Sequence, residues 1–127
     1  MKKTTGNERK KSRMNKITNI QDIEQVRGHC GTIRRMTTDG PARFIHLLVN
    51  DAERHYHEKT TEYYYVLNGE GRIYLDGKIR DIKKGDLVTI PPGTIHNAIE
   101  QDGPLEIMVI EVPPAIDDVF KTSEATS

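Results

Sequence analysis

Most of the chain after residue 31 consists of short runs of alternating or β-branched residues, separated by turn-forming residues. Glycine, proline, asparagine and aspartate punctuate these runs, and each favours a turn for its own conformational reason. Short strands at such regular spacing are typical of an all-β sandwich or barrel. We expect strands at residues 32–38, 42–50, 63–67, 72–75, 78–81, 87–90 and 105–112.

One hairpin can be predicted in detail. Asp76-Gly77 lies between two of the expected strands, and an Asp-Gly pair is among the strongest two-residue hairpin signals. A two-residue turn there places Leu75 opposite Lys78 and Arg72 opposite Asp81. The second pair joins opposite charges across the strands, which supports this register.

The two flanks of the strand-rich region are less regular. Ile17, Ile20, Ile23 and Val26 recur at every third position, which indicates a short helix or a covering strand. Near the other end, the spacing of residues 116, 119 and 120 indicates one turn of docked helix. We therefore assign residues 17–120 to one folded domain and residues 121–127 to a flexible C-terminus.

The charged residues are unevenly distributed, and the basic ones are concentrated at the N-terminus. The whole chain has a formal net charge of zero, but residues 1–16 hold seven basic residues and one acidic residue, a net +6, which leaves −6 for the remainder. With so few apolar residues, we expect residues 1–16 to be a disordered basic tail. The acidic body predicts no nucleic-acid-binding face, and the length leaves no room for a helix-turn-helix beside a barrel. A solvated tail is a commoner outcome than one that binds nucleic acid or anionic membrane.

The single cysteine indicates which cellular compartment the protein could occupy. Cys30 has no partner for an intramolecular disulfide, so an oxidising environment is not required. We also find no apolar run of the length of a secretory signal core or of a membrane span. We therefore expect a cytoplasmic protein without a membrane partner, in which Cys30 is a small packing residue.

Candidate chemistry is concentrated between residues 55 and 69. His55 and His57 are two residues apart in an extended segment, so their imidazoles point to the same side and form half of a metal site. Glu62 follows after a polar run long enough to turn a corner. A third imidazole could come from His96, which follows the rigid corner at residues 91–93.

These residues resemble the two motifs of the cupin superfamily. His55-Tyr56-His57, four residues, Glu62, six residues and Gly69 match the first motif, except that Val49 replaces its opening glycine. The second motif is matched by Gly85, Pro91, Gly93 and His96, whereas Glu100 replaces its final asparagine. The resemblance covers roughly residues 31–112.

This resemblance implies a small antiparallel jelly-roll β-barrel, with His55, His57, Glu62 and His96 as ligands of one divalent metal ion. Three imidazoles and a carboxylate suit Fe, Mn, Co, Ni, Cu or Zn, but neither a Ca²⁺ site nor a thiolate zinc finger. Four protein ligands on an octahedral ion leave two positions for water, substrate or dioxygen. His29 and His46 have no motif position, and we expect them to be structural or exposed.

Strand parity divides the aromatic run that follows Glu62. Tyr64 and Val66 are expected on the ligand face, while Tyr63, Tyr65 and Leu67 face the second sheet or a partner in a homodimer, which is common in cupins. Tyr64 is our candidate catalytic residue: its phenol could donate a hydrogen bond to substrate, or act as a base if the cation lowered its pKa. Alternatively, Tyr64 only lines the barrel.

The resemblance to cupins implies a metal-dependent enzyme that acts on a small polar molecule such as a carboxylic acid, a keto acid or a sugar derivative. Dioxygenase, decarboxylase, isomerase and lyase chemistry are all compatible with the ligand set. The alternatives are a non-catalytic module that binds metal or small molecules, and a purely structural barrel.

Overall fold

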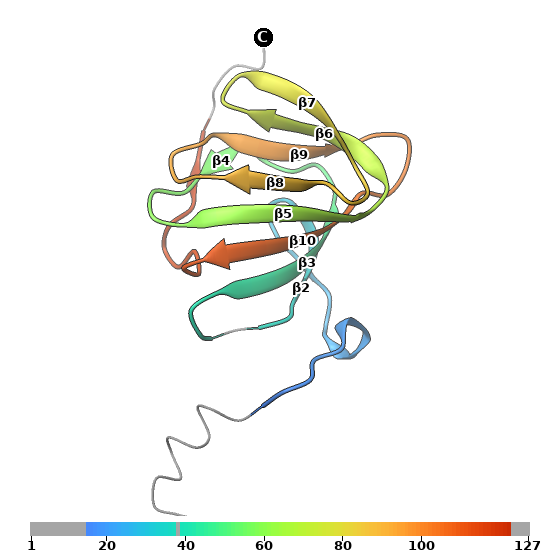
Figure 1. Cartoon of the computed structure of the whole chain (residues 1–127), viewed down its shortest axis with the longest axis vertical. Coiled ribbons are helices and arrows are strands. Elements are labelled where there is room, and N and C mark those ends of the chain that lie inside the picture. The colour runs from blue at the N-terminus through green and yellow to red at the C-terminus, as the bar shows by residue number, and fades with distance from the viewer. Residues whose placement is uncertain (1–14, 38, 123–127) are drawn as a thin grey trace, which may run out of the picture.

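The computed structural model describes residues 15–37 and 39–122. Within these residues the chain contains β-strands and one turn of 3-10 helix, η1 (Ile20–Asp22), but no α-helix. The strands, of which β2 to β10 are labelled in Figure 1, are β1 (Val26–Arg27), β2 (Gly31–Arg35), β3 (Arg43–Val49), β4 (His55–Tyr56), β5 (Thr61–Asn68), β6 (Glu70–Leu75), β7 (Lys78–Lys83), β8 (Leu87–Ile90), β9 (His96–Glu100), β10 (Glu106–Val112) and β11 (Phe120–Lys121).

The strands form two antiparallel sheets. Six of them follow the order β1-β2-β3-β10-β5-β8, and the other five follow the order β11-β4-β9-β6-β7. The apolar core includes Leu47, Val66, Ile73 and Ile107, each at most 2% exposed. The predicted all-β antiparallel barrel is therefore confirmed.

Alternation along β5 follows the predicted parity. Tyr64 and Val66 are 2% and 0% exposed, while Tyr65 between them is 44% exposed. The outward residues of β5 therefore do not face the second sheet, which leaves solvent or a partner chain for that side. The inner face of β5 belongs to the core and to the site described below.

The predicted hairpin is also confirmed. Leu75 pairs with Lys78 and Arg72 pairs with Asp81 across β6 and β7. Asp76 and Gly77 have φ values of 46° and 94°, as a turn with two left-handed central residues requires. The Arg72–Asp81 ion pair is 3.5 Å long and largely exposed, so it contributes little to stability.

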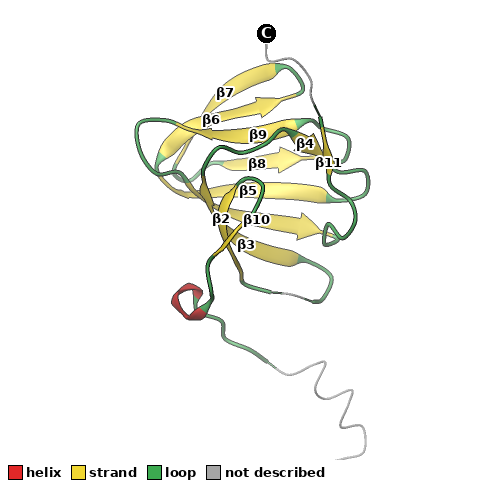
Figure 2. Ribbon diagram, turned by 180° about the vertical axis from the view of Figure 1, so that it is seen from behind, coloured by secondary structure: helices red, strands yellow, loops and turns green. Residues whose placement is uncertain are grey.

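The predicted helical turn near residues 116–120 is wrong. Asp117 has φ 53°, a left-handed value that interrupts a right-handed helix, and Phe120 instead begins β11, which pairs with β4. At the other flank, both alternatives for residues 17–26 occur in part, because η1 precedes the short strand β1. Figure 2 shows η1 outside the two sheets.

Two expectations concern the ends of the chain. The basic tail falls mainly within residues 1–14, and most of the C-terminal segment falls within residues 123–127, all outside the described residues. No helix in residues 15–37 or 39–122 combines the length and apolar character that a membrane crossing requires.

Candidate metal centre

The four predicted ligands converge inside the barrel. His55 of β4 lies directly opposite His96 of β9, whereas Glu62 comes from β5 and His57 follows β4. Each of the four is at most 3% exposed. One ligand atom from each lies within 4.8 Å of the others, so a single ion could contact all four.

Backbone carbonyls determine which imidazole nitrogen faces the centre. His55 Nδ1 lies 2.9 Å from the carbonyl oxygen of Glu53, and His96 Nδ1 lies 2.8 Å from that of Thr94. A carbonyl oxygen only accepts, so each Nδ1 must donate its hydrogen. Each neutral ring is thereby left with a lone pair on Nε2, the nitrogen available to a metal.

His57 is oriented in the same way by a distant segment. Its Nδ1 donates to the carbonyl oxygen of Asp118 at 2.6 Å. Its Nε2 is buried and has no hydrogen-bond partner among the described residues, although it lies 3.0 Å from Glu62 Oε1. A buried nitrogen without a hydrogen-bond partner, directed at a carboxylate, is the arrangement that an ion between the two would satisfy.

Glu62 brings negative charge to the same point. Its Oε1 lies 2.8 Å from His96 Nε2 as well as 3.0 Å from His57 Nε2. Three nitrogen donors and one carboxylate suit a divalent transition metal, with bonds of about 2.0–2.2 Å in the case of zinc. The residues present therefore fit the predicted metal ion.

Burial and neighbouring charge shift the pKa values of these groups in opposite directions. Burial lowers the pKa of His55 to about 3, and the nearby His96 adds to this effect, so His55 is neutral at pH 7. Burial alone would lower the pKa of His57, but the negative charge of the adjacent Glu62, together with the contact to the Asp118 backbone, outweighs burial and raises it. Burial would raise the pKa of Glu62, yet His57 and His96 hold it well below its usual range.

The centre opens into a cavity of about 210 Å³. Its lining includes His55, His57 and Glu62 together with apolar side chains of β3 and β10. Tyr64 also lines the cavity, with its ring 5.8 Å from that of His96, on the ligand side that its strand parity predicts. A small molecule could therefore reach the candidate ligands from within the barrel.

Asp118 supports the centre and was not predicted from the sequence. Its carboxylate accepts hydrogen bonds from the backbone nitrogens of Glu58, Lys59 and Thr60 at 2.8, 2.9 and 3.0 Å. Burial would raise the pKa of this carboxyl, but the three bonds outweigh burial and lower it. Asp118 thus orders the turn between His57 and Glu62, while its carbonyl oxygen orients the His57 ring.

The remaining histidines and the cysteine differ in their positions. His46 is buried and pairs with Glu106, as expected of a structural residue, whereas His29 is half-buried and lines the cavity, with its ring 4.7 Å from that of His55. Cys30 belongs to the apolar core, and burial raises the pKa of its thiol to about 12. His29, Cys30 and His55 also lie close together, but the raised pKa of the thiol opposes the deprotonation that a thiolate ligand requires.

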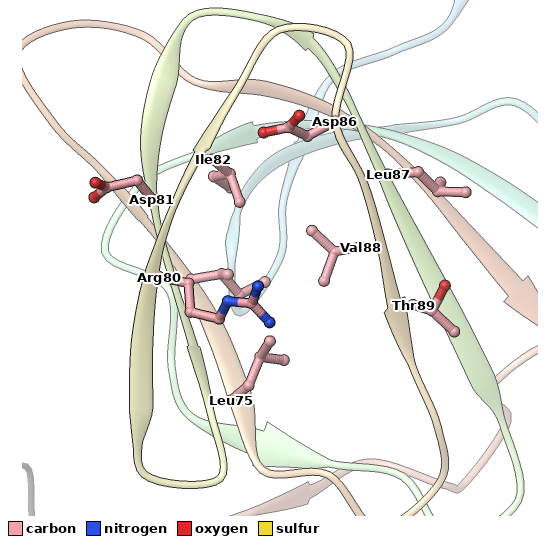
Figure 3. Close-up of a pocket in the computed structure, with 9 residues that line it drawn as sticks. Leu75, Arg80, Asp81, Ile82, Asp86, Leu87, Val88 and Thr89 are labelled. Carbon is pink, nitrogen blue, oxygen red and sulfur yellow. The ribbon is translucent and has the colours of Figure 1, made fainter.

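A second cavity, of about 350 Å³, lies between β7 and β8 (Figure 3). Arg80 reaches from β7 toward Leu75 and Val88, and two aspartates and Thr89 complete the polar part of the lining. The residues that line it include no histidine and no cysteine. Of the four candidate ligands, His55, His57 and Glu62 line the first cavity, and none lines this one.

Comparison with known proteins identifies the family to which this fold belongs. A family model described as the cupin domain matches residues 45–111, just over half of the chain. The chain belongs to the cupin family. An uncharacterized protein of Methanocaldococcus jannaschii is 44% identical over 62 residues, which are 47% of this chain and 49% of that protein.

Two similar proteins have named activities. Quercetin 2,3-dioxygenase of Bacillus subtilis is 29% identical over 68 residues, which are 54% of this chain but only 20% of the dioxygenase. The solved structure of the nucleoside dehydratase Pac13 of Streptomyces superposes with a TM-score of 0.74 at 20% identity, and covers 86% of this chain and 92% of its own. The second likeness supports the cupin fold.

Proposed function

We propose that this cupin is a metal-dependent enzyme that acts on a small polar molecule, with His55, His57, Glu62 and His96 as the ligands of one divalent transition metal. The observation that carries the proposal is the orientation of the three imidazoles. Each Nδ1 hydrogen is donated to a backbone carbonyl, which leaves Nε2 as the ring nitrogen that could bind a metal beside Glu62. A packing histidine does not require this arrangement, whereas a ligand does.

A divalent metal at this centre would act as a Lewis acid toward a bound oxygen atom of the substrate. The chain's own contribution would include Tyr64. Burial, followed by the charge of Glu62, raises the pKa of the phenol well above its usual range, so the hydroxyl is protonated. We therefore favour Tyr64 as a hydrogen-bond donor to substrate over Tyr64 as a base.

The type of reaction stays open within the proposal. Proteins similar to this chain are named as a dioxygenase and as a nucleoside dehydratase, so one barrel supports unrelated reactions. The metal centre defines where chemistry occurs, and the rest of the cavity selects the substrate.

The metal assignment can be tested by mass spectrometry of protein purified without chelator. We expect about one transition-metal ion per wild-type chain, and much less in His57→Ala. His46→Ala is the matched control, because His46 is also a buried histidine but lies outside the centre. Equal metal content in wild type and His57→Ala would contradict the assignment.

Turnover separates an enzyme from a binding module. The metal-loaded protein would be incubated with a panel of small carboxylic acids, keto acids and sugar derivatives, and the products identified by mass spectrometry. We expect a product that wild type forms and His57→Ala does not. Ligands that raise the melting temperature of the loaded protein but are never converted would favour the non-catalytic module instead.

We also propose a homodimer formed through the outer face of the six-stranded sheet. Phe44, Tyr65 and Leu87 lie on strands of this sheet and are 38%, 44% and 57% exposed. Tyr65 lies between Leu87 and Met108 in the strand register, so the apolar side chains are continuous across three strands. Light scattering should give the mass of a dimer for wild type and of a monomer for Tyr65→Glu; a monomeric wild type would contradict this proposal.

A further inference from the structure

Three charged residues lie side by side across the six-stranded sheet. Glu111 of β10 pairs with Arg43 of β3 on one side and with Glu62 of β5 on the other. Directly opposed residues of antiparallel strands place their side chains on the same face, with Cβ atoms about 4.5–5.5 Å apart. All three line the cavity, so the register connects a candidate metal ligand to an arginine.

The exposure of these side chains changes steadily along the row. Arg43 is 18% exposed, Glu111 8% and Glu62 4%. The arginine therefore lies at the more accessible end and the metal centre at the buried end. A ligand entering the cavity can meet both.

The guanidinium of Arg43 has hydrogen-bond donors that remain available to a ligand. Its Nη1 lies 3.6 Å from Glu111 Oε1, too far for a hydrogen bond, and its Nε is buried without a partner among the described residues. Glu111 Oε1 instead accepts a hydrogen bond from the backbone nitrogen of Ala115 at 3.0 Å. A guanidinium presents a planar fork of five donors that matches a carboxylate, and a buried donor left unpaired costs free energy.

The next layer of the cavity lining is mostly apolar, so it offers few groups that could hydrogen-bond to Arg43 in place of a ligand. Ile45, Val109 and Tyr64 are register partners one layer deeper, and Leu47 lies beyond them. Two strand spacings, about 10 Å in total, separate the backbones that carry Arg43 and Glu62. A cavity of about 210 Å³ corresponds to about seven water molecules of roughly 30 Å³ each. The space therefore suits a small molecule with one polar group at each end.

We propose that Arg43, positioned beside Glu111, binds a carboxylate of the substrate and so makes this cupin selective for small carboxylic acids whose opposite end reaches the metal centre. This inference rests on the proposed function, because it uses the same cavity. A dianionic phosphate is disfavoured, since Glu111 and Glu62 lie in the same row as the guanidinium of Arg43. A neutral sugar or nucleoside would leave the arginine unpaired.

Isothermal titration of the full chain loaded with Mn²⁺ tests this proposal. The probes are pyruvate, malonate and succinate, with succinamide as a neutral counterpart of succinate and inorganic phosphate as a second anion. We expect at least one carboxylate to bind saturably, and phosphate to bind more weakly than that carboxylate. We expect Arg43→Gln to weaken carboxylate binding about 10- to 100-fold, the scale of a charge-assisted bidentate contact.

Arg72→Gln is the matched control, because it removes the same charge from an exposed hairpin outside the cavity. Arg43→Lys should recover part of the lost affinity, since it restores the charge without the planar fork. If Arg43→Gln does not fold, the comparison of succinate with succinamide on wild type still decides. Failure of all three carboxylates to bind, equal binding of succinate and succinamide, tighter binding of phosphate, or unchanged affinity in Arg43→Gln would each overturn the proposal.

Metal content measured on the same samples separates the two proposals. A wild-type chain that binds no Mn²⁺ would contradict the proposed function. A chain that binds Mn²⁺ normally, with carboxylate affinity insensitive to Arg43, would contradict only the role of Arg43.

Discussion

Replacement of Asp118 by alanine should weaken both the fold and the metal centre. The carboxylate of Asp118 accepts hydrogen bonds from three consecutive backbone nitrogens in the turn between His57 and Glu62. Alanine removes this acceptor but keeps the carbonyl oxygen that His57 Nδ1 contacts. The variant therefore disturbs the turn without deleting a ligand.

The magnitude follows from the number and kind of bonds. A hydrogen bond to a charged group contributes about 1.5–3 kcal/mol, but three bonds to one carboxylate are not additive, and water can solvate part of an opened turn. We expect a loss of about 3–4 kcal/mol in the free energy of unfolding, a large share of the usual ~5–15 kcal/mol. Metal affinity should fall about 10- to 100-fold, as for other residues that orient ligands.

Urea denaturation at pH 7 measures the first quantity, and titration with Mn²⁺ measures the second. Asp81→Ala is the control, because Asp81 is 91% exposed and its ion pair with Arg72 spans 3.5 Å at the surface. We expect this control to remain within about 0.5 kcal/mol of wild type. An Asp118→Ala variant as stable as the control, with wild-type metal affinity, would refute the reasoning.

Three further predictions follow from individual residues. Because the pKa of His57 is raised, a metal ion must displace the proton of His57 at low pH. The affinity for Mn²⁺ should therefore fall about tenfold per pH unit below that pKa. Equal affinity at pH 6 and pH 8 in titration calorimetry would contradict this. Tyr64→Phe should keep its metal by mass spectrometry but lose about tenfold or more in turnover, whereas unchanged turnover would leave Tyr64 a lining residue. Gly69→Ala should lower the free energy of unfolding, measured by urea denaturation, by about 3 kcal/mol or more, because Gly69 has φ 87° and an added Cβ would lie 2.1 Å from the Pro104 carbonyl oxygen. Gly77→Ala is the control and should lower it by only about 1 kcal/mol, because Gly77 has φ 94° but open space around it. Equal losses in the two variants would contradict the argument.

The ligands could be predicted from sequence because their positions are encoded locally. His55 and His57 share a face through the two-residue period of an extended chain, and turn residues mark the corners before Glu62 and His96. The same period correctly predicted that Tyr64 is buried on the ligand face and that Tyr65 faces outward.

The supporting residues could not be predicted, because their partners are distant in sequence. Asp118 contacts a turn about 60 residues earlier, and a lone aspartate near the end of the chain resembles any solvated carboxylate. Glu111 and Arg43 meet only through the register of β10 and β3. His29 carries no motif, yet it lines the cavity with its ring beside that of His55.

The incorrect helical turn has a related cause. Ile116, Val119 and Phe120 match a helical period, but Asp117 takes a left-handed conformation and Phe120 pairs with Tyr56 in β4. The stacked rings of Tyr56 and Phe120 and the bonds of Asp118 outweigh the weak local preference of a single helical turn.

The most direct test of the metal centre is a crystal of the metal-loaded protein measured at the absorption edge of the metal. Our account predicts one anomalous-scattering peak per chain, bonded to Nε2 of His55, His57 and His96 and to a carboxylate oxygen of Glu62. A peak bonded to other residues, or a loaded crystal without a peak among these four side chains, would contradict it.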